Sequence, residues 1–513
     1  MTKLFRHLDL SRLGPTFMLA SGILSSYIFW RTRDSLWEDE IIAITHGLQP
    51  LPEFFVEVLR NDIHPFLYFL LLKFWTALDF GSDSWALGSS LFAVLLSIAA
   101  IWLVVRRLYD AQAALWAVAL FSVLPASVAA AGNLRMYGIV PAIAVLCWFA
   151  NREFLRSGRA VWAVILMFFL IVQVYIHAIG FYFAAFFALA ALIEQWNNVD
   201  RTRIWHWLFL QTLSLAIMLP VVASALIRGT EPLPMLTLAN LLYFPAALIM
   251  GQAVSFPYGV VFGAFTFLFL FVYSLLKDRT ARILVLTIPC GGLITCMLIS
   301  LIGKPMFKAP VFAAEMLPFL IIGAAGSISK VTSTPLKLFA VGYGLLLSIC
   351  LLSWAPNHHV AENYRPAAEY VASHARFGDT VIVPHVSVYW GIMRYAVGAR
   401  WGSPLGTMPL RSNEAWLSLK NKIGPRLFER LGLNPKTDFV DSNGIKYVIG
   451  ADASAYLKNS NKVWVVHRSN YKEPVVLGKP MKTEEVTWFG DELSVSALVP
   501  DVTGGAILSN PKK

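Results

Sequence analysis

Three consecutive carboxylates, Glu38-Asp39-Glu40, follow the first long apolar run of the chain. Like charges this close repel one another, and at a membrane surface they lose part of their hydration, which favours a carboxylate able to take up a proton. The pattern predicts that at least one of the three carboxylates acts as a general base. The alternative is a solvated acidic helix start, because negative side chains suit the helix dipole at that position.

The stretch Asp62-Ile63-His64-Pro65 is a second candidate for chemistry. An aspartate and a histidine two residues apart, stiffened by a proline, can together face one metal ion or one phosphate. Asp62 and His64 could then share a divalent cation such as Mg²⁺ or Mn²⁺, although two ligands are few for a metal site. The alternative is a proline-stiffened turn at the start of a helix.

The stretch Arg135-Met136-Tyr137 ends an apolar run and predicts a phosphate site. A guanidinium can hold a phosphate through two parallel hydrogen bonds, and a phenol adds a further donor. Lys304 and Lys308, on either side of Pro305, could add positive charge to the same site. For each of these residues the alternative is a side chain that reaches the lipid headgroups and anchors a helix end.

Two further polar residues lie in strongly apolar surroundings. His177 stands at a short turn between two apolar runs, where a structural role is the alternative to a functional one. Glu315 lies inside an apolar run, and an ionisable residue within a membrane span is a functional candidate by default. Its alternative role is to pair with a nearby lysine and brace the helices.

The composition shows what kind of elements must position these residues. Of the 513 residues, 57% are apolar and only 14% are charged, and the mean hydropathy is +0.61. A soluble chain this apolar could not cover its own surface, so the chain is predicted to be a polytopic membrane protein. The four cysteines lie in apolar runs, which indicates core packing. The net charge of +11 is attributed to membrane topology and not to nucleic-acid binding.

The hydropathy pattern predicts about eleven transmembrane helices, near residues 14–30, 84–105, 111–131, 134–150, 160–176, 178–194, 204–226, 258–276, 282–303, 308–326 and 336–354. Two other runs, 64–80 and 238–256, are predicted to lie on the outer face. Fifteen of the 23 basic residues before Pro356 then fall on one side, which the positive-inside rule makes the cytoplasm. The amino terminus is therefore predicted inside, as a retained first span, and the chain after Pro356 outside.

The chain divides by composition into two predicted domains. Residues 1–356 form the transmembrane domain, in which residues 31–83 are the catalytic outer loop. Residues 357–513 are more charged and alternate a helix near 361–376 with short strands, which predicts a soluble α/β domain in the periplasm. No glycine-rich nucleotide-binding loop occurs in a strand–helix context.

These motifs, in this order, resemble the membrane glycosyltransferases of the C-type (GT-C) fold, near glycosyltransferase family 39. That group includes protein O-mannosyltransferases, the lipid A aminoarabinose transferase and rhizobial galacturonosyltransferases. The matching stretches are 35–40, 62–68, 80–84, 135–137, 175–177 and 364–368. The resemblance implies a GT-C membrane domain with outer-face juxtamembrane helices and an outer tail domain. It also implies that Asp39 and Glu40 are catalytic, and that Asp62, His64, Arg135 and Tyr137 lie near the donor phosphate.

The sequence therefore predicts an inverting glycosyltransferase of the cell envelope, acting on the outer face of a bacterial inner membrane. It would move a monosaccharide from a polyprenyl-phosphate donor to a lipid, glycan or protein acceptor. Such a donor fits the lack of a nucleotide-binding loop. Two alternatives stay open: a flippase or transporter for lipid-linked saccharides, which predicts charges spread through the bundle and repeated halves, and a ligase, which differs mainly in donor size.

Overall fold

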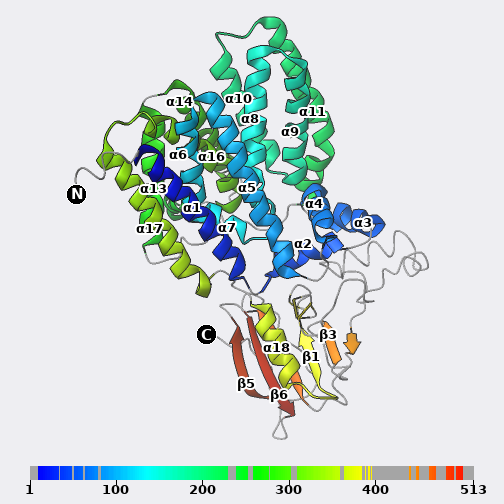
Figure 1. Cartoon of the computed structure of the whole chain (residues 1–513). Helices are drawn as coiled ribbons and strands as arrows, with labels where there is room; N and C mark the ends of the chain where they lie inside the picture. Colours follow the sequence, from blue (N-terminus) through cyan, green and yellow to red (C-terminus); the bar gives the residue numbers. More distant parts are fainter. Residues whose placement is uncertain are drawn as a thin grey trace. The chain divides into compact units, whose positions relative to one another are not determined.

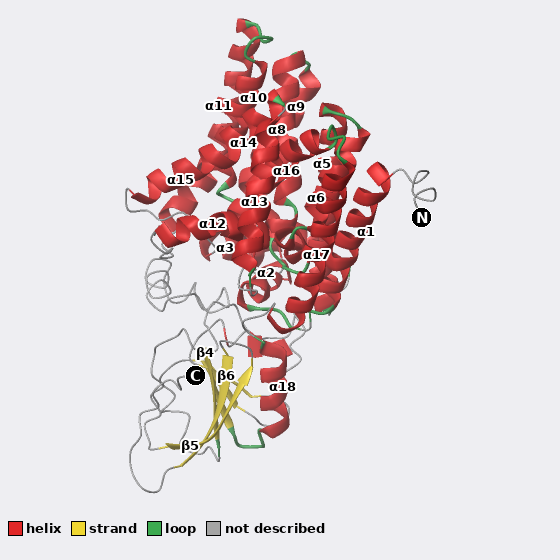
Figure 2. Ribbon diagram, turned by 90° about the vertical axis from the view of Figure 1, so that its left-hand side faces the viewer, coloured by secondary structure: helices red, strands yellow, loops and turns green. Residues whose placement is uncertain are grey.

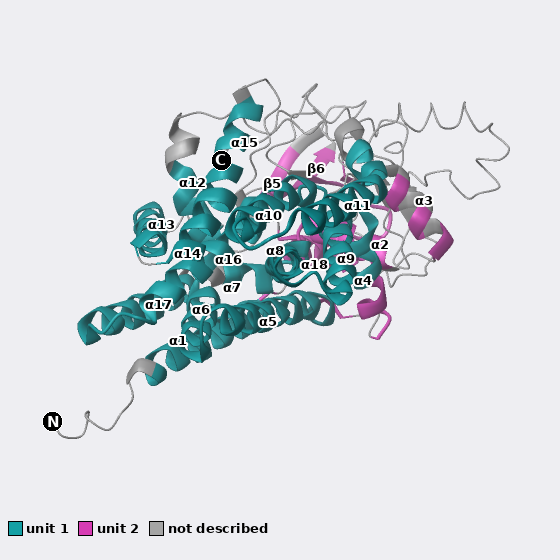
Figure 3. Ribbon diagram, turned by 90° about the horizontal axis from the view of Figure 1, so that it is seen from above, with its two compact units in different colours: residues 1–32, 62–72, 84–356 teal, residues 33–61, 73–83, 357–513 magenta. Residues whose placement is uncertain are grey.

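The chain packs into two compact units (Figure 3). Unit 1 comprises residues 1–32, 62–72 and 84–356, and unit 2 comprises residues 33–61, 73–83 and 357–513. The boundary after Pro356 is also where the sequence predicts the end of the transmembrane domain. The computed structural model describes residues 10–33, 35–48, 51–61, 64–78, 82–228, 238–251, 258–276, 278–301, 309–358, 363–383, 388, 391–392, 394–395, 438–440, 446–449, 462–468, 481–489 and 493–500.

Unit 1 is a bundle of apolar helices (Figure 1). Its helices are α1 (Leu10–Arg31), α5 (Asp83–Leu108, whose first residue belongs to unit 2), α6 (Ala111–Val123), α7 (Pro125–Ala131), α8 (Val140–Ser157), α9 (Ala160–Ile176), α10 (Gly180–Gln195), α11 (Arg201–Arg228), α12 (Leu238–Met250), α13 (Gly259–Leu276), α14 (Arg279–Val285), α15 (Gly291–Leu301), α16 (Ala309–Ile328) and α17 (Thr334–His358). A π-helical turn, η4 (Leu286–Cys290), joins α14 to α15 around Pro289, which has no N–H to donate.

The chain is a polytopic helical membrane protein. Within the described residues, six helices are long and apolar enough to cross a membrane, or seven if α6 and α7 count as one bent span. Helices α9, α10 and the part of α16 from Phe312 to Ile328 are apolar but shorter. A helix lies at each of the eleven predicted runs. That all eleven cross the membrane stays a prediction.

Helix α16 is the core of the bundle. Its residues from Phe312 to Ser327 are all buried, as expected of a helix that is apolar on every side. The Phe319 ring packs on Trp148 of α8 and Phe187 of α10, with ring centroids 6.0 and 5.2 Å apart. These contacts set the position of α8 and of the α9–α10 turn, both of which carry candidate site residues.

The predicted span 111–131 is broken at Pro125. Helix α6 ends one residue before Leu124, α7 begins at Pro125, and their axes differ by 69°. Leu124 is extended, with φ −70° and ψ 132°, because a following proline disfavours the helical conformation. Pro125 itself suits the first position of a helix, where an N–H would have no partner.

Two helices are too short to span a membrane by themselves. Helix α4 (Phe66–Thr76) has 11 residues and α12 has 13. At 1.5 Å per residue they are about 16 and 20 Å long, against a hydrocarbon core of about 30 Å. That the runs 64–80 and 238–256 lie on the outer face stays a prediction.

Among the described residues, unit 2 contains three whole helices, the last residues of α4 and a mixed sheet (Figures 1 and 2). The helices are α2 (Glu38–Leu48), α3 (Leu51–Asn61) and α18 (Tyr364–His374). The strands are β1 (Thr380–Val383), β2 (Asp438–Val440), β3 (Lys446–Ile449), β4 (Val463–Arg468), β5 (Met481–Phe489) and β6 (Leu493–Pro500), in the order β2-β3-β1-β4-β6-β5. Strand β1 is parallel to β3 and β4 and is buried at all four residues, as its Thr-Val-Ile-Val sequence favours.

Candidate active site

The turn that carries Arg135 joins two helices of unit 1. The predicted span 134–150 begins later than expected, because α8 starts at Val140 and residues 136–138 form a short 3₁₀ turn. Arg135 precedes that turn in an extended conformation, and only 4% of its surface is exposed. The guanidinium is therefore held in the protein and does not extend freely to lipid headgroups.

Ser97 of α5 holds this turn through two hydrogen bonds. Its hydroxyl donates to the Gly138 carbonyl at 2.7 Å and accepts from the Ala142 amide at 3.1 Å. Gly138 lies so close to α5 that an added Cβ would be 3.0 Å from the Ser90 carbonyl oxygen. A glycine at this position therefore lets the turn pack tightly, which gives Arg135 a defined place.

His64 and Arg135, 71 residues apart in sequence, are hydrogen-bonded in unit 1. The Arg135 Nη2 lies 2.6 Å from the His64 Nε2. A guanidinium can only donate, so the His64 Nε2 accepts, and the ring is neutral with its proton on Nδ1. Pro65 follows at once, and α4 begins at Phe66, so the stiffened turn predicted from the sequence presents the imidazole to Arg135.

His177 and Tyr137 complete the group. His177 caps the end of α9, and its Nδ1 accepts from the Ile179 amide at 3.2 Å. Its ring centroid lies 5.5 Å from that of His64 and 6.5 Å from that of Tyr137. Three separate segments thus bring four sequence-predicted residues together. We name these residues, His64, Arg135, Tyr137 and His177, the Arg135 cluster.

The Arg135 cluster has the chemistry of an anion site. It offers a guanidinium, a phenol and two imidazoles at one end of the helix bundle, and all four can donate hydrogen bonds. Bonds from an arginine to phosphate oxygens are short, charge-assisted and often paired. The lining is only partly exposed at His64 and Tyr137 and buried at Arg135 and His177, which strengthens such bonds.

Glu315 lies in the bundle core and contacts α9, the helix that ends beside His177. It is fully buried, and its Oε1 accepts from the Gln173 Nε2 of α9 at 2.5 Å. Gln173 is one helical turn before His177, whose backbone N–H donates to the Gln173 carbonyl. In the described part of the chain no lysine pairs with Glu315, so the bracing partner is a glutamine. Lys304 and Lys308 lie outside the described residues.

The acidic stretch belongs to unit 2, and Trp37 occupies the position just before α2. The Glu40 Oε2 accepts from the Trp37 amide at 3.1 Å, which is the carboxylate half of a capping box. The same oxygen accepts from the Arg33 Nη2 at 2.5 Å. The Glu40 side chain is 0% exposed and that of Arg33 is 2% exposed. Glu40 is thus a buried, ion-paired residue that shapes the start of α2.

Asp39 occupies the second position of α2 and is partly exposed. Its neighbour Glu40 is held by Arg33, so the two adjacent carboxylates lie in different surroundings. A partly exposed carboxylate at a rigid helix start can accept a proton from a hydroxyl group that reaches it. A negative side chain at this position also suits the helix dipole, so the alternative role of Asp39 is a structural one at the start of the helix.

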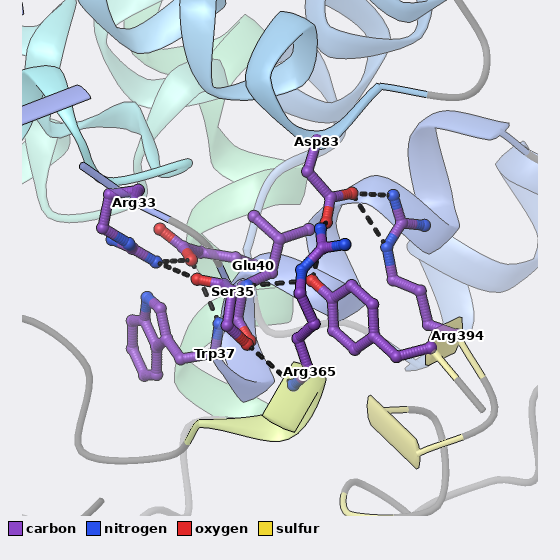
Figure 4. A network of polar contacts seen from close by, with 9 residues as sticks. Arg33, Ser35, Trp37, Glu40, Asp83, Arg365 and Arg394 are labelled. Carbon is purple, nitrogen blue, oxygen red and sulfur yellow. Dashed lines mark hydrogen bonds and ion pairs between the residues drawn. The ribbon is translucent and has the colours of Figure 1, made fainter. Parts of the chain in front are cut away.

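Five charged or polar residues of this region were not among the sequence candidates. In unit 2, Asp83 accepts from Arg365, Arg394 and Tyr395, and Arg33 pairs with Glu40 (Figure 4). Asp83 and Arg365 stand inside stretches that match the GT-C pattern, so the sequence carried a signal for them. No motif or spacing in the sequence around residues 394 and 395 indicates a role for Arg394 or Tyr395.

The metal prediction rests on Asp62, which lies outside the described residues, and on His64. The His64 Nε2 is hydrogen-bonded to Arg135. In the part of the chain that the structure describes, no three His, Cys, Asp or Glu residues gather as a metal site would require. That Asp62 and His64 hold a divalent cation stays a prediction, because Asp62 lies outside the described residues.

Comparison with known proteins gives the fold. No protein-family model matches the chain, and no curated protein matches its sequence significantly. Among solved structures, ArnT from Cupriavidus metallidurans bound to undecaprenyl phosphate is 12% identical, with 96% of this chain and 98% of that chain covered and a TM-score of 0.55. Apo ArnT from the same organism is 13% identical, with 94% and 97% covered and a TM-score of 0.58.

The chain has the GT-C fold. The similarity extends over almost the whole length of both chains, so it includes the helix bundle and the tail. It confirms, for the fold, the resemblance to GT-C membrane glycosyltransferases that the sequence motifs indicate. In this GT-C chain the Arg135 cluster comes from residues 64, 135, 137 and 177, all of which belong to the stretches that resemble the GT-C motifs.

Proposed function

We propose that this GT-C chain is an inverting glycosyltransferase that uses a polyprenyl-phosphate monosaccharide. The observation that carries the proposal is the Arg135 cluster within a fold shared with ArnT, a protein solved with undecaprenyl phosphate bound. The cluster offers the donors that a phosphate needs, and the apolar helices around it suit a polyprenyl tail. The acceptor is a lipid, glycan or protein hydroxyl.

The proposed reaction is a single displacement. Asp39 takes the proton of the acceptor hydroxyl, and the acceptor oxygen forms a bond to the anomeric carbon of the sugar. The bond between that carbon and the phosphate oxygen breaks, and its electron pair leaves with polyprenyl phosphate. Negative charge therefore grows on the phosphate, and Arg135, with the Nδ1–H of His64 and the hydroxyl of Tyr137, stabilises it. Glu40 acts through α2 as a positioning residue.

A direct test follows the leaving group. The purified chain in nanodiscs is given a panel of polyprenyl-phosphate monosaccharides and an envelope extract, and free polyprenyl phosphate is measured with labelled sugar on the acceptor. Glycosyl transfer releases polyprenyl phosphate in step with labelled product. Translocation of intact donor without release would instead show a flippase. A parallel arm with a chelator tests the divalent cation predicted at Asp62 and His64. The displacement as proposed needs no metal, so sugar transfer should persist in the chelator.

Arg135→Lys separates phosphate binding from helix anchoring. Lysine keeps the charge but cannot make the paired, planar contact, so we expect about 10- to 100-fold weaker apparent donor affinity. The measurement is donor dependence of the transfer rate in nanodiscs. Arg156→Lys is the control, because Arg156 is largely exposed and pairs with Glu153 on the same helix. An Arg135→Lys variant with unchanged donor dependence would return Arg135 to a structural role.

The orientation in the membrane can be tested with reporters. The proposal places the amino terminus in the cytoplasm and the tail on the periplasmic side of a bacterial inner membrane, from the 15-of-23 basic asymmetry. We expect alkaline phosphatase fused after Asn357 to be active, because it forms its disulfides only outside the cytoplasm. Fusion after Gly158, in the α8–α9 turn, should be inactive. The opposite pattern would move every proposed site residue to the wrong side.

A further inference from the structure

The Asp83 carboxylate of unit 2 is surrounded by donors from the tail. Its Oδ2 accepts from the Arg365 Nη2 at 3.0 Å and from the Tyr395 hydroxyl at 2.7 Å. Its Oδ1 accepts from the Arg394 Nε at 3.0 Å and also from the Arg394 Nη2. Asp83 is only 13% exposed, so this carboxylate is held on both oxygens (Figure 4). Such a fully bonded acid is a rigid anchor.

Tyr395 links Asp83 to the segment before α2. Its hydroxyl donates to Asp83 and accepts from the Leu36 backbone N–H at 3.0 Å. Burial, and after it the negative charge of Asp83, raises the pKa of the Tyr395 phenol above its ordinary value. The phenol therefore keeps its proton at neutral pH and can make both bonds at once. The Arg365 guanidinium lies over the same ring, 4.6 Å from its centroid.

Ser35 and Leu36, which precede α2, are both held by hydrogen bonds. The Leu36 N–H is bound by Tyr395, and the Ser35 hydroxyl accepts from the Arg365 backbone N–H at 3.2 Å. The Ser35 carbonyl accepts from the Arg33 Nη2 at 3.0 Å. Trp37, the cap of α2, follows directly, and Asp39 is two residues further. The direction in which α2 starts is therefore set by bonds to tail residues 365 and 395.

We propose that Tyr395, anchored by Asp83, is a positioning residue that fixes the first turn of α2 and so the place of Asp39. The inference rests on the proposed role of Asp39 as general base. Proximity effects are steep, and a misplacement of about 1 Å can cost about 100-fold in rate. The tail would then contribute to the reaction by holding the catalytic loop, and not only by covering it.

Tyr395→Phe tests this inference, because it removes one oxygen and keeps the ring beneath Arg365. We expect kcat to fall by about 10- to 100-fold while the apparent donor KM stays unchanged, since Tyr395 does not touch the donor. In hydrogen-exchange mass spectrometry, peptides that contain Leu36 and Trp37 should exchange about 2- to 10-fold faster. Tyr370→Phe, on α18, is the matched control and should change neither quantity.

A second variant, Asp83→Asn, tests the same network from its anchor. It keeps the Tyr395 hydroxyl but loosens its anchor, so the same peptides should exchange faster. In the Asp83→Asn background, Tyr395→Phe should add less than it does alone, because both changes act on one network. Exchange in peptides from β6, residues 493–500, should match the wild type and so report that the tail is folded.

The exchange measurement does not depend on sugar transfer, so the two proposals can fail separately. If the wild-type chain transfers no sugar, the proposed function fails, and faster exchange at Leu36 would still show the coupling between tail and loop. Unchanged exchange at Leu36 in both variants would overturn the inference. It is also overturned if exchange rises while kcat stays at the wild-type value, because Tyr395 would then hold the loop without serving Asp39.

Discussion

Asp39→Asn is expected to lower the rate of sugar transfer by about 10²- to 10⁴-fold, the usual contribution of a general base. Asparagine has the same shape but cannot take the acceptor proton. Because Asp39 is partly exposed and its neighbour Glu40 carries the buried ion pair, the substitution should leave the fold intact. The measurement is kcat with purified lipid-linked donor, together with donor binding, which should stay at the wild-type level.

The matched control for this substitution is Glu38→Gln. Glu38 is in the same helical turn, is also partly exposed, and loses the same charge. We expect it to keep transfer within a few-fold of the wild type. Equal losses in the two variants would show that the charge of the acidic turn matters and not the base. An Asp39→Asn variant with the wild-type rate would remove Asp39 from the mechanism.

Glu40→Gln is expected to act on stability first. The side chains of Glu40 and Arg33 are almost fully buried, and removal of one partner leaves a buried charge without its counter-charge. Such changes cost roughly 3–5 kcal/mol. We expect a lower thermal midpoint and faster inactivation of the detergent-solubilised protein, with loss of transfer in proportion to the folded fraction. Glu38→Gln serves again as the exposed counterpart.

The double variant Arg33→Gln with Glu40→Gln identifies the ion pair as the cause. With both charges gone, no buried charge is left alone, so the double variant should be more stable than the sum of the two single losses predicts. Additive losses would show that the two residues stabilise the loop separately. If Glu40→Gln were as stable as the wild type yet inactive, Glu40 would itself be part of the chemistry and not a positioning residue.

The adjacent residues Asp39 and Glu40 show what a sequence can and cannot decide. The stretch Glu38-Asp39-Glu40 indicates an acidic helix start, since local charge and capping preferences depend on neighbours in the chain. Which of the three carboxylates becomes buried depends on Arg33, which folds back over the loop to pair with Glu40. The spacing between Arg33 and Glu40 gives no hint of this pairing, because they lie on either side of an irregular segment.

Other features follow the same division. The sequence alone determined the membrane class and the positions of the apolar helices, because apolar composition and periodicity act locally. The order of the GT-C motifs pointed to the fold that ArnT shares. Only the tertiary structure decided that Arg135 binds His64 across 71 residues, and that Tyr395 binds Leu36 across 359 residues. Contacts between residues so far apart in the sequence depend on how the elements pack, and packing is a property of the whole fold.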